Sequence, residues 1–159
     1  MRPGDYAFRP VERADPALLA TWRAMPHVLR WWGQPDPSEG YADPNVARWI
    51  VSAAGRAFAY LQDYPVHAWP NHHFADLPFG TRGIDLYIGP GDLVGRGHGV
   101  GLAHAAVARL FDDGAPVIAT DPHPENARAI AVFRKAGFVA SGPPRDSAWG
   151  PILPMVARR

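Results

Sequence analysis

The sequence contains no cysteine and no strong excess of either charge. Zero cysteines among 159 residues exclude disulfide bonds, thiolate metal sites and a cysteine nucleophile. A formal net charge of +1 with 19% charged residues gives no basic surface for nucleic acid or an anionic membrane, so neither is an expected partner. Residues 1–5 lack the apolar core of a leader, and no apolar run approaches a membrane span, so we expect a cytoplasmic protein.

Lysine is almost absent as well, since Lys135 is the only one. A Walker phosphate loop requires Lys and then Ser or Thr after its last glycine, which excludes that loop for the glycine-rich stretch 95–101. The dinucleotide pattern Gly-x-Gly-x-x-Gly is excluded too, because Val100 and Leu102 stand where glycines would be needed. Two common phosphate-binding motifs are therefore ruled out.

What the stretch does contain is a turn followed by a helix. Glycines occupy alternate positions from 95 to 101, and apolar residues then recur at helical spacing, at Val100, Ala103, Val107 and Leu110. Backbone N–H groups at the start of such a helix can hold a phosphate oxygen, and the helix dipole favours its charge. We interpret the stretch as a pyrophosphate-binding turn; a flexible turn before an ordinary helix is the alternative.

The length suits one domain, residues 1–159, with a single core. Apolar and alternating runs predict strands at 6–11, 47–52, 57–62, 81–88, 116–120, 139–140 and 151–157. Capping signals predict further helices at 17–25, 27–33 and 125–136, with Asp15 capping the first and Pro26 ending it. Loops are expected at 36–43 and 63–74. Hairpins mixed with crossovers predict an α/β fold with helices on both faces of a mixed sheet.

Several segments together resemble one enzyme family over almost the whole chain. Arg96-x-x-Gly99-x-Gly101 resembles the motif with which GNAT superfamily N-acetyltransferases hold the pyrophosphate of acetyl-coenzyme A. The segment 121–138 resembles the second coenzyme A segment of these enzymes. The stretch 81–85 resembles the acid-bearing strand of aminoglycoside 6'-N-acetyltransferases, and 30–33 and 60–64 resemble their substrate-side segments.

The resemblance implies a GNAT-like, mostly antiparallel sheet and acetyl transfer from acetyl-CoA to a primary amine, the 6'-amine of an aminoglycoside, without a metal. Residues assigned to the cofactor are Leu86, Tyr87, Ile88, Arg96, Gly97, His98, Gly99, Val100, Gly101, Asn126, Ala129 and Phe133. Residues assigned to the substrate are Trp31, Trp32, Gln62, Asp63, Tyr64, Asp85 and Asp121. The adjacent indoles cannot both face inward, so we expect one to line the substrate cleft. A monomer and a homodimer both remain open.

The chemistry itself needs a base, because an amine must be neutral to attack a thioester. Asp85 is our candidate, since Asp is disfavoured in mid-strand and its strand should end near the glycine-rich turn. Asp121 ends the next core strand and could face the same cleft, or it could be an ordinary turn residue before Pro122. Without a Cys or a Gly-x-Ser-x-Gly elbow, we expect direct attack in a ternary complex.

Two departures from the family pattern bear on function. Phe133 stands where many relatives carry a Tyr that protonates the leaving thiolate. The acidic loop of aminoglycoside-modifying relatives is replaced by residues 67–74, whose His67, His72 and His73 we interpret as surface histidines rather than a metal site. The alternatives are an amine or hydroxylamine acyltransferase of siderophore assembly, and a non-catalytic acyl-CoA or drug-binding protein. Asn126 has two interpretations, a helix cap and a ligand of the pantetheine arm.

Overall fold

A computed structural model describes residues 5–35 and 43–159, so all but the last residue of the loop expected at 36–43 lies outside the described residues. The helices are α1 (Pro16–Arg23), α2 (Pro26–Trp32), α3 (His98–Asp112) and α4 (Ala127–Lys135), with 3₁₀ turns at Val66–Ala68 and Gly91–Leu93. The strands are β1 (Tyr6–Pro10), β2 (Ala47–Ala53), β3 (Arg56–Pro65), β4 (Arg82–Ile88), β5 (Val117–Thr120), β6 (Val139–Ala140), β7 (Arg145–Ser147), β8 (Gly150–Ile152) and β9 (Met155–Arg158).

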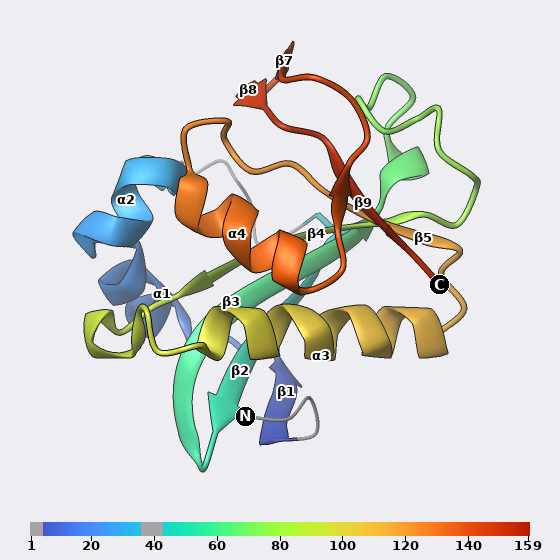
Figure 1. Cartoon of the computed structure of the whole chain (residues 1–159). Coiled ribbons are helices and arrows are strands. Elements are labelled where there is room, and N and C mark those ends of the chain that lie inside the picture. Colours follow the sequence, from blue (N-terminus) through green and yellow to red (C-terminus); the bar gives the residue numbers. More distant parts are fainter. Residues whose placement is uncertain (1–4, 36–42) are drawn as a thin grey trace.

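The principal sheet has seven strands in the order β1-β2-β3-β4-β5-β9-β6 (Figure 1). Every neighbouring pair is antiparallel except β4 and β5, which run parallel. The predicted mixed, mostly antiparallel sheet is thereby confirmed. The hairpin of β7 and β8 forms a separate two-stranded sheet that the sequence did not predict, because three-residue strands leave no readable alternation.

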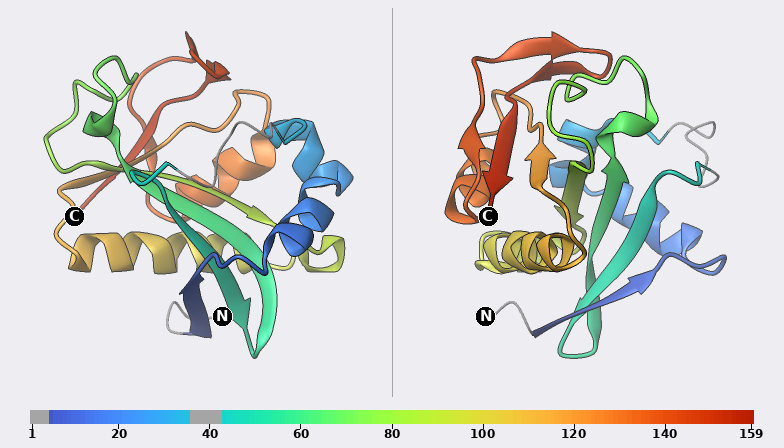
Figure 2. Two further views of the ribbon diagram at one scale, coloured as in Figure 1. Left: turned by 180° about the vertical axis from the view of Figure 1, so that it is seen from behind. Right: turned by 90° about the vertical axis from the view of Figure 1, so that its right-hand side faces the viewer.

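Helices cover both faces of the sheet, as predicted (Figure 2). On one face α3 and α4 pack against the sheet, and Ile84 of β4 is buried among Val107 and Ile130. On the other face α1 and α2 pack against β2, β3 and β4, where Trp22 and Tyr87 belong to one buried cluster. Alternation along β4 thus directs Asp85 and Tyr87 toward the α1–α2 side. No helix within 5–35 and 43–159 is long and apolar enough to cross a membrane.

The N-terminal helices differ from the prediction in two details. Pro26 does not simply end α1 but occupies the first turn of α2, where its fixed φ angle suits a helix start. Asp15 does not cap α1 through its side chain. Its carboxylate instead accepts two hydrogen bonds from the Arg9 guanidinium, at 2.7 and 2.8 Å, and one from the Glu12 N–H. Arg9 engages both carboxylate oxygens in a bidentate ion pair, and this geometry explains why the side chain does not cap the helix.

The predicted hairpin of β2 and β3 is confirmed, with Ala54 and Gly55 in its turn at positive φ of 49° and 78°. The loop expected at 63–74 begins later, because β3 continues to Pro65 and pairs with β4 from Ala59 to Pro65. Asp63 and Tyr64 are therefore strand residues. Since side chains alternate along a strand, Gln62 and Tyr64 lie on one face of the sheet and Asp63 lies on the other.

Candidate functional site

Strand β4 has one edge that is only partly paired. Within the described part of the chain, β5 pairs with β4 at Arg82 and Gly83 alone, and the Thr120 hydroxyl then donates to the Ile84 carbonyl at 3.0 Å. On the other edge, the Gly89 N–H donates to the Phe58 carbonyl next to the β3–β4 pairing. Peptide groups alternate along a strand, so the N–H groups of residues 86 and 88 face the gap beside β5.

This alternation separates the three β4 residues assigned to the cofactor. The N–H groups of Leu86 and Ile88 point into the gap, whereas the N–H of Tyr87 points toward β3. The Ile88 carbonyl is already engaged, since His27 Nε2 lies 2.8 Å from it. An extended ligand that bears amide groups could hydrogen-bond to this edge as an added strand would.

The start of α3 directs backbone donors away from the helix near this edge. Gly97, with φ of 85°, precedes the helix, and the first helical hydrogen bond runs from the Gly101 N–H to the Gly97 carbonyl at 3.3 Å. The N–H groups of His98, Gly99 and Val100 therefore precede the hydrogen bonds of the helix and point out of its positive end. The predicted turn followed by a helix is confirmed, and its donors suit a phosphate oxygen together with the exposed Arg96.

Gly101, which the sequence assigned to the cofactor, lies in a close packing contact with β1. A Cβ atom there would overlap the Tyr6 hydroxyl of β1 and lie 3.0 Å from Tyr6 Cε2. At Gly99 a Cβ atom would lie 3.3 Å from Cγ2 of Val132 in α4. The Gly101 N–H is bonded within α3, and the missing side chain of this glycine admits the packing of Tyr6 from β1.

Two carboxyl groups, on β4 and after β5, lie together on the α1–α2 side. Gln62 Nε2 donates to Asp85 Oδ2 at 2.9 Å, and the Tyr60 hydroxyl donates to Gln62 Oε1 at 2.8 Å. Burial, repulsion by the Asp121 carboxylate and a hydrogen bond from Asp85 to Asp121 together raise the pKa of Asp85 to about 8. The Asp85–Asp121 pair therefore keeps one proton at neutral pH.

A histidine completes this group. His73 Nε2 lies 2.7 Å from Asp121 Oδ2, and the two side chains are only 9% and 17% exposed. The interpretation of His73 as a surface residue was wrong, and no signal in the sequence joins it to an acid 48 positions away. The ring of His72 stacks on His73 with centroids 4.2 Å apart. Burial and the neighbouring His73 lower the pKa of His72 to about 4, so its ring is neutral.

The other two histidines of this loop, His67 and His72, contact backbone groups of the loop itself. Among residues 5–35 and 43–159, no group of three or more His, Cys, Asp or Glu side chains could hold a metal ion. His72 Nδ1 accepts a hydrogen bond from the Phe74 N–H at 3.1 Å, and His67 Nε2 lies 3.1 Å from the Ala75 carbonyl. These two rings therefore help to shape the loop that carries His73.

Tyr64 borders the carboxyl pair from β3. Its ring lies against the backbone of Gly83, where an added Cβ atom would lie 2.7 Å from the phenol oxygen. Burial and the charges of Asp85 and Asp121 raise the pKa of Tyr64 well above its usual value. Its hydroxyl therefore stays neutral and can donate a hydrogen bond to a carboxylate or a ligand.

The two tryptophans of α2 diverge, as their adjacency predicts. Trp32 packs edge-on against Tyr60 and Tyr87, with ring centroids 6.0 and 5.0 Å away. Trp31 lies beside His123, which follows Asp121 in the chain, at a centroid distance of 5.4 Å. Trp31 is thus the indole nearer to the loop after β5, while Trp32 belongs to the aromatic layer over the sheet.

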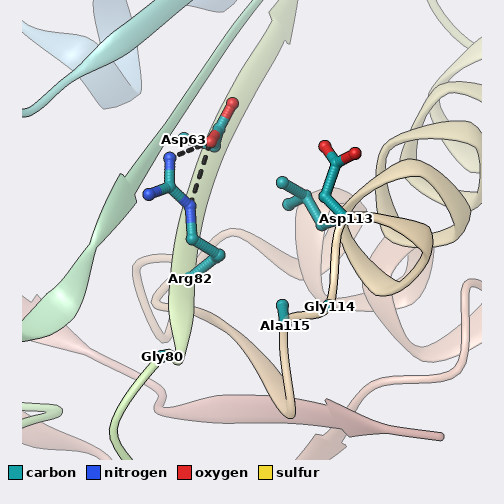
Figure 3. Close-up of a pocket in the computed structure, with 7 residues that line it drawn as sticks. Asp63, Gly80, Arg82, Asp113, Gly114 and Ala115 are labelled. Carbon is teal, nitrogen blue, oxygen red and sulfur yellow. Dashed lines mark hydrogen bonds and ion pairs between the residues drawn. The ribbon is translucent and has the colours of Figure 1, made fainter.

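Asp63 does not join the groups with which the sequence placed it. Its carboxylate pairs with Arg82 and accepts a hydrogen bond from Trp49 Nε1 at 2.8 Å. Figure 3 shows Arg82 reaching Asp63 in a pocket of about 390 Å³, which the end of α3 and the turn after it also line. This pocket lies on the α3 face, so Asp63 is on the opposite side of the sheet from Asp85, contrary to its assignment to the substrate.

Three residues of α4 and its cap were assigned to the cofactor. Asn126 caps α4, since its Oδ1 accepts the Ala129 N–H at 3.1 Å, and Ala129 itself is half-buried. Phe133 is buried in the core and packs edge-on against Phe138, with centroids 5.3 Å apart. Phe133 carries no proton that could be transferred, and the capping interpretation of Asn126 is the one with a contact in the structure.

A second pocket, of about 480 Å³, opens beside His73. Residues 69–73 line one side of it, and residues 146–149 around the β7–β8 turn line the other. Trp149 is 73% exposed, and its ring centroid lies 5.7 Å from that of His73. The carboxyl pair is thus linked through His73 to an open, aromatic-lined pocket.

Comparison with known proteins points to one family. A family model described as "Acetyltransferase (GNAT) domain" matches residues 12–143. An "Aminoglycoside N(6')-acetyltransferase type 1" from Klebsiella pneumoniae is 33% identical over 91% of this chain and 79% of its own length. A "Kanamycin resistance protein" from Rhizobium radiobacter is 41% identical over 50% of this chain and 74% of its own.

Solved structures agree. The structure of AAC(6')-Ib with paromomycin and acetyl-CoA superimposes with a TM-score of 0.88 at 30% identity, covering 98% of this chain and 94% of that one. AAC(6')-Ib with coenzyme A and kanamycin gives a TM-score of 0.87, also at 30% identity, over 97% and 95% of the two chains. The mixed sheet and its four helices are therefore shared with proteins that bind coenzyme A and aminoglycosides.

Proposed function

The chain belongs to the GNAT acetyltransferase family, and we propose that it transfers acetyl from acetyl-CoA to the 6'-amine of an aminoglycoside. The observation that carries the acceptor half of this proposal is the Asp85–Asp121 pair, held by Gln62 and His73. Carboxylates attract a polycationic amine, and one of them can take the proton that the amine must lose. The relatives named above, which act on or bind aminoglycosides, support the same choice of acceptor.

Within the pair we assign different roles to the two acids. Asp85 accepts the proton of the bound ammonium, directly or through water, because its pKa of about 8 lies close to the working pH. Asp121 keeps a negative charge that anchors the ammonium. Tyr64 and Gln62 fix the geometry around them as neutral hydrogen-bonding groups.

Acetyl-CoA supplies the activated thioester carbonyl that the neutral amine attacks. The N–H groups of His98, Gly99 and Val100, with Arg96, fit its pyrophosphate, because the α3 start leaves these donors outside its own hydrogen bonds. The N–H groups of Leu86 and Ile88 fit the amides of its pantetheine arm or the acetyl carbonyl. Phe133 gives the leaving sulfur no proton, so that proton comes from water or another group.

The remaining parts of the proposal concern the protein as a whole. We place it in the cytoplasm as one domain, without a bound metal and without nucleic acid or membrane partners. A role in aminoglycoside resistance follows from the proposed reaction. Light scattering at micromolar protein distinguishes a monomer from a homodimer.

The experiment that tests the proposal measures thiol release from acetyl-CoA with aminoglycoside acceptors. A matched pair of aminoglycosides that differ only in an amine or a hydroxyl at the 6' position gives the control. We expect turnover with the amine and at least about 100-fold less with the hydroxyl, which is the weaker nucleophile here. Turnover with hydroxylamine-type acceptors and none with any aminoglycoside would refute the proposed acceptor.

A further inference from the structure

His73 stands out among the groups around the carboxyl pair, because it is a polar contact of Asp121 that comes from a distant loop. Its Nε2 lies 2.7 Å from Asp121 Oδ2. Asp85 is the other polar neighbour of Asp121, since the two carboxyl groups are close enough for Asp121 to raise the pKa of Asp85. Gln62, Asp85, Asp121 and His73 thus form one row of polar side chains from β3 to the 480 Å³ pocket.

The position of His73 is fixed by contacts from three sides. Arg145 of β7 donates from Nη2 to the His73 carbonyl at 2.7 Å, which ties the loop to the β7–β8 hairpin. The His72 and Phe74 rings lie 4.2 and 4.5 Å from the His73 ring, centroid to centroid. Trp149 approaches it edge-on. Because these contacts hold the His73 ring in place, the ring can fix the position of the Asp121 carboxylate.

We propose that His73 is a positioning residue that donates a hydrogen bond to Asp121, holds the negative charge of the carboxyl pair there and leaves the proton on Asp85. The inference deepens the proposed function, because this division of charge serves catalysis only if the pair receives the amine. A donor stabilises the ionised form of its acceptor, so His73 favours the anion on Asp121. Asp121 thereby presents a fixed anion to the ammonium, and Asp85 accepts a proton only in its ionised form, which predominates once the pH exceeds its pKa of about 8.

Other charged or titratable groups also face His73. His72 is neutral, since burial and His73 lower its pKa to about 4. Arg145 contacts the backbone carbonyl of His73, and Asp146 lines the same pocket. Tyr64 stays neutral beside the pair. Among the side chains of these residues, His73 is the one within hydrogen-bond distance of Asp121.

The test follows the carboxyl ¹³C signal of Asp85 in aspartate-labelled protein, assigned by its loss in Asp85→Asn. In His73→Phe, which keeps an aromatic ring but lacks the donor, the Asp85 signal should titrate about one pH unit lower, because the proton can then pass to Asp121. In His73→Gln, whose amide nitrogen can still donate, the titration should stay within about 0.3 units of wild type. His67→Phe is the matched control, since His67 is in the same loop and contacts the Ala75 carbonyl instead.

Steady-state kinetics distinguish an effect on amine binding from an effect on the chemical step. We expect His73→Phe to raise KM for the amine about tenfold, with kcat within about threefold and KM for acetyl-CoA unchanged. His73→Gln should restore KM for the amine.

An unchanged Asp85 titration in His73→Phe, or equal behaviour of the Phe and Gln variants, overturns the proposal. If His73→Phe does not fold, Arg145→Met loosens the same loop from the surface and should lower the Asp85 titration by a smaller amount. An unchanged Asp85 titration in Arg145→Met would count against the proposal. The ¹³C readout needs no acceptor, so it is independent of whether wild type acetylates aminoglycosides.

Discussion

Gly101 of α3 lies directly against the phenol of Tyr6 in β1, so closely that a methyl group on Gly101 would overlap the hydroxyl. The glycine-rich turn therefore has a packing role as well as the ligand-binding role that we propose for it. The N–H groups at the helix start are the proposed phosphate donors, and Gly101, one turn further on, lets the first strand pack on the helix.

Gly101→Ala should consequently lower stability rather than ligand affinity. We expect a loss of about 1–3 kcal/mol in the free energy of unfolding, as for other overpacked sites, with coenzyme A affinity of the folded protein near wild type. Tyr6→Phe removes the nearest atom and should relieve part of this loss. Denaturant melts of the single and double variants measure the coupling, and equal losses in both backgrounds would contradict the packing role.

Arg96→Ala should weaken coenzyme A binding without changing the melting temperature. Its exposed side chain lies at the start of α3, where a cation supplements the helix dipole. We expect about a fivefold to tenfold loss of affinity that shrinks at high salt. Arg159→Ala is the matched control, because Arg159 pairs with Asp112 at the opposite end of α3. Calorimetric titrations at two salt concentrations check the result, and equal effects of the two variants would argue against an anion site.

Asp85→Asn should abolish most turnover while coenzyme A binding persists. The amide keeps the shape but cannot accept a proton, and a positioned base contributes about 10² to 10⁴ in rate. For wild type, kcat/KM should rise with pH up to about 8, because Asp85 acts in its ionised form. Steady-state rates from pH 6 to 9 provide the measurement. A change confined to KM for the amine would make Asp85 an anchor instead of a base.

Asp85 should also make the stability of the fold depend on pH. Its pKa is raised from about 3.8 in the unfolded chain to about 8 in the fold, so its protonated form favours the folded state. This contribution is complete below pH 4 and is lost as the pH rises through 8. Wild type should therefore lose more stability than Asp85→Asn between pH 5 and 8.5. Thermal melts across that range test the sign, and parallel curves would contradict it.

Neighbouring residues of β3 should respond in opposite ways because they face opposite sides of the sheet. Asp63→Asn breaks the pair with Arg82 on the α3 face, so it should lower the melting temperature and leave KM for the amine unchanged. Gln62→Leu removes the donor to Asp85 and should lower kcat/KM with little change in melting. The two measurements together on each variant check the assignment, and an increased KM in Asp63→Asn would contradict it.

The sequence by itself determined the features that depend on neighbours in the chain. The turn and helix at 95–112 and the β2–β3 hairpin follow from local glycine and apolar patterns, and they were predicted within a few residues. A cap at Asn126 was one of two interpretations, and the motif Arg96-x-x-Gly99-x-Gly101 pointed to acetyl-CoA through its resemblance to GNAT enzymes. Each of these signals lies within one segment, where spacing translates directly into geometry.

Only the tertiary structure decided which side chains meet. His73 reaches Asp121 across 48 positions, and the continuation of β3 to Pro65 places Asp63 on the face opposite Asp85, where it pairs with Arg82. Gly101 is constrained by Tyr6, which belongs to the first strand of the chain and is far from Gly101 in the sequence. Contacts of this kind depend on the register of strands and on which segments the core brings together, and neither is encoded in the spacing of residues within one segment.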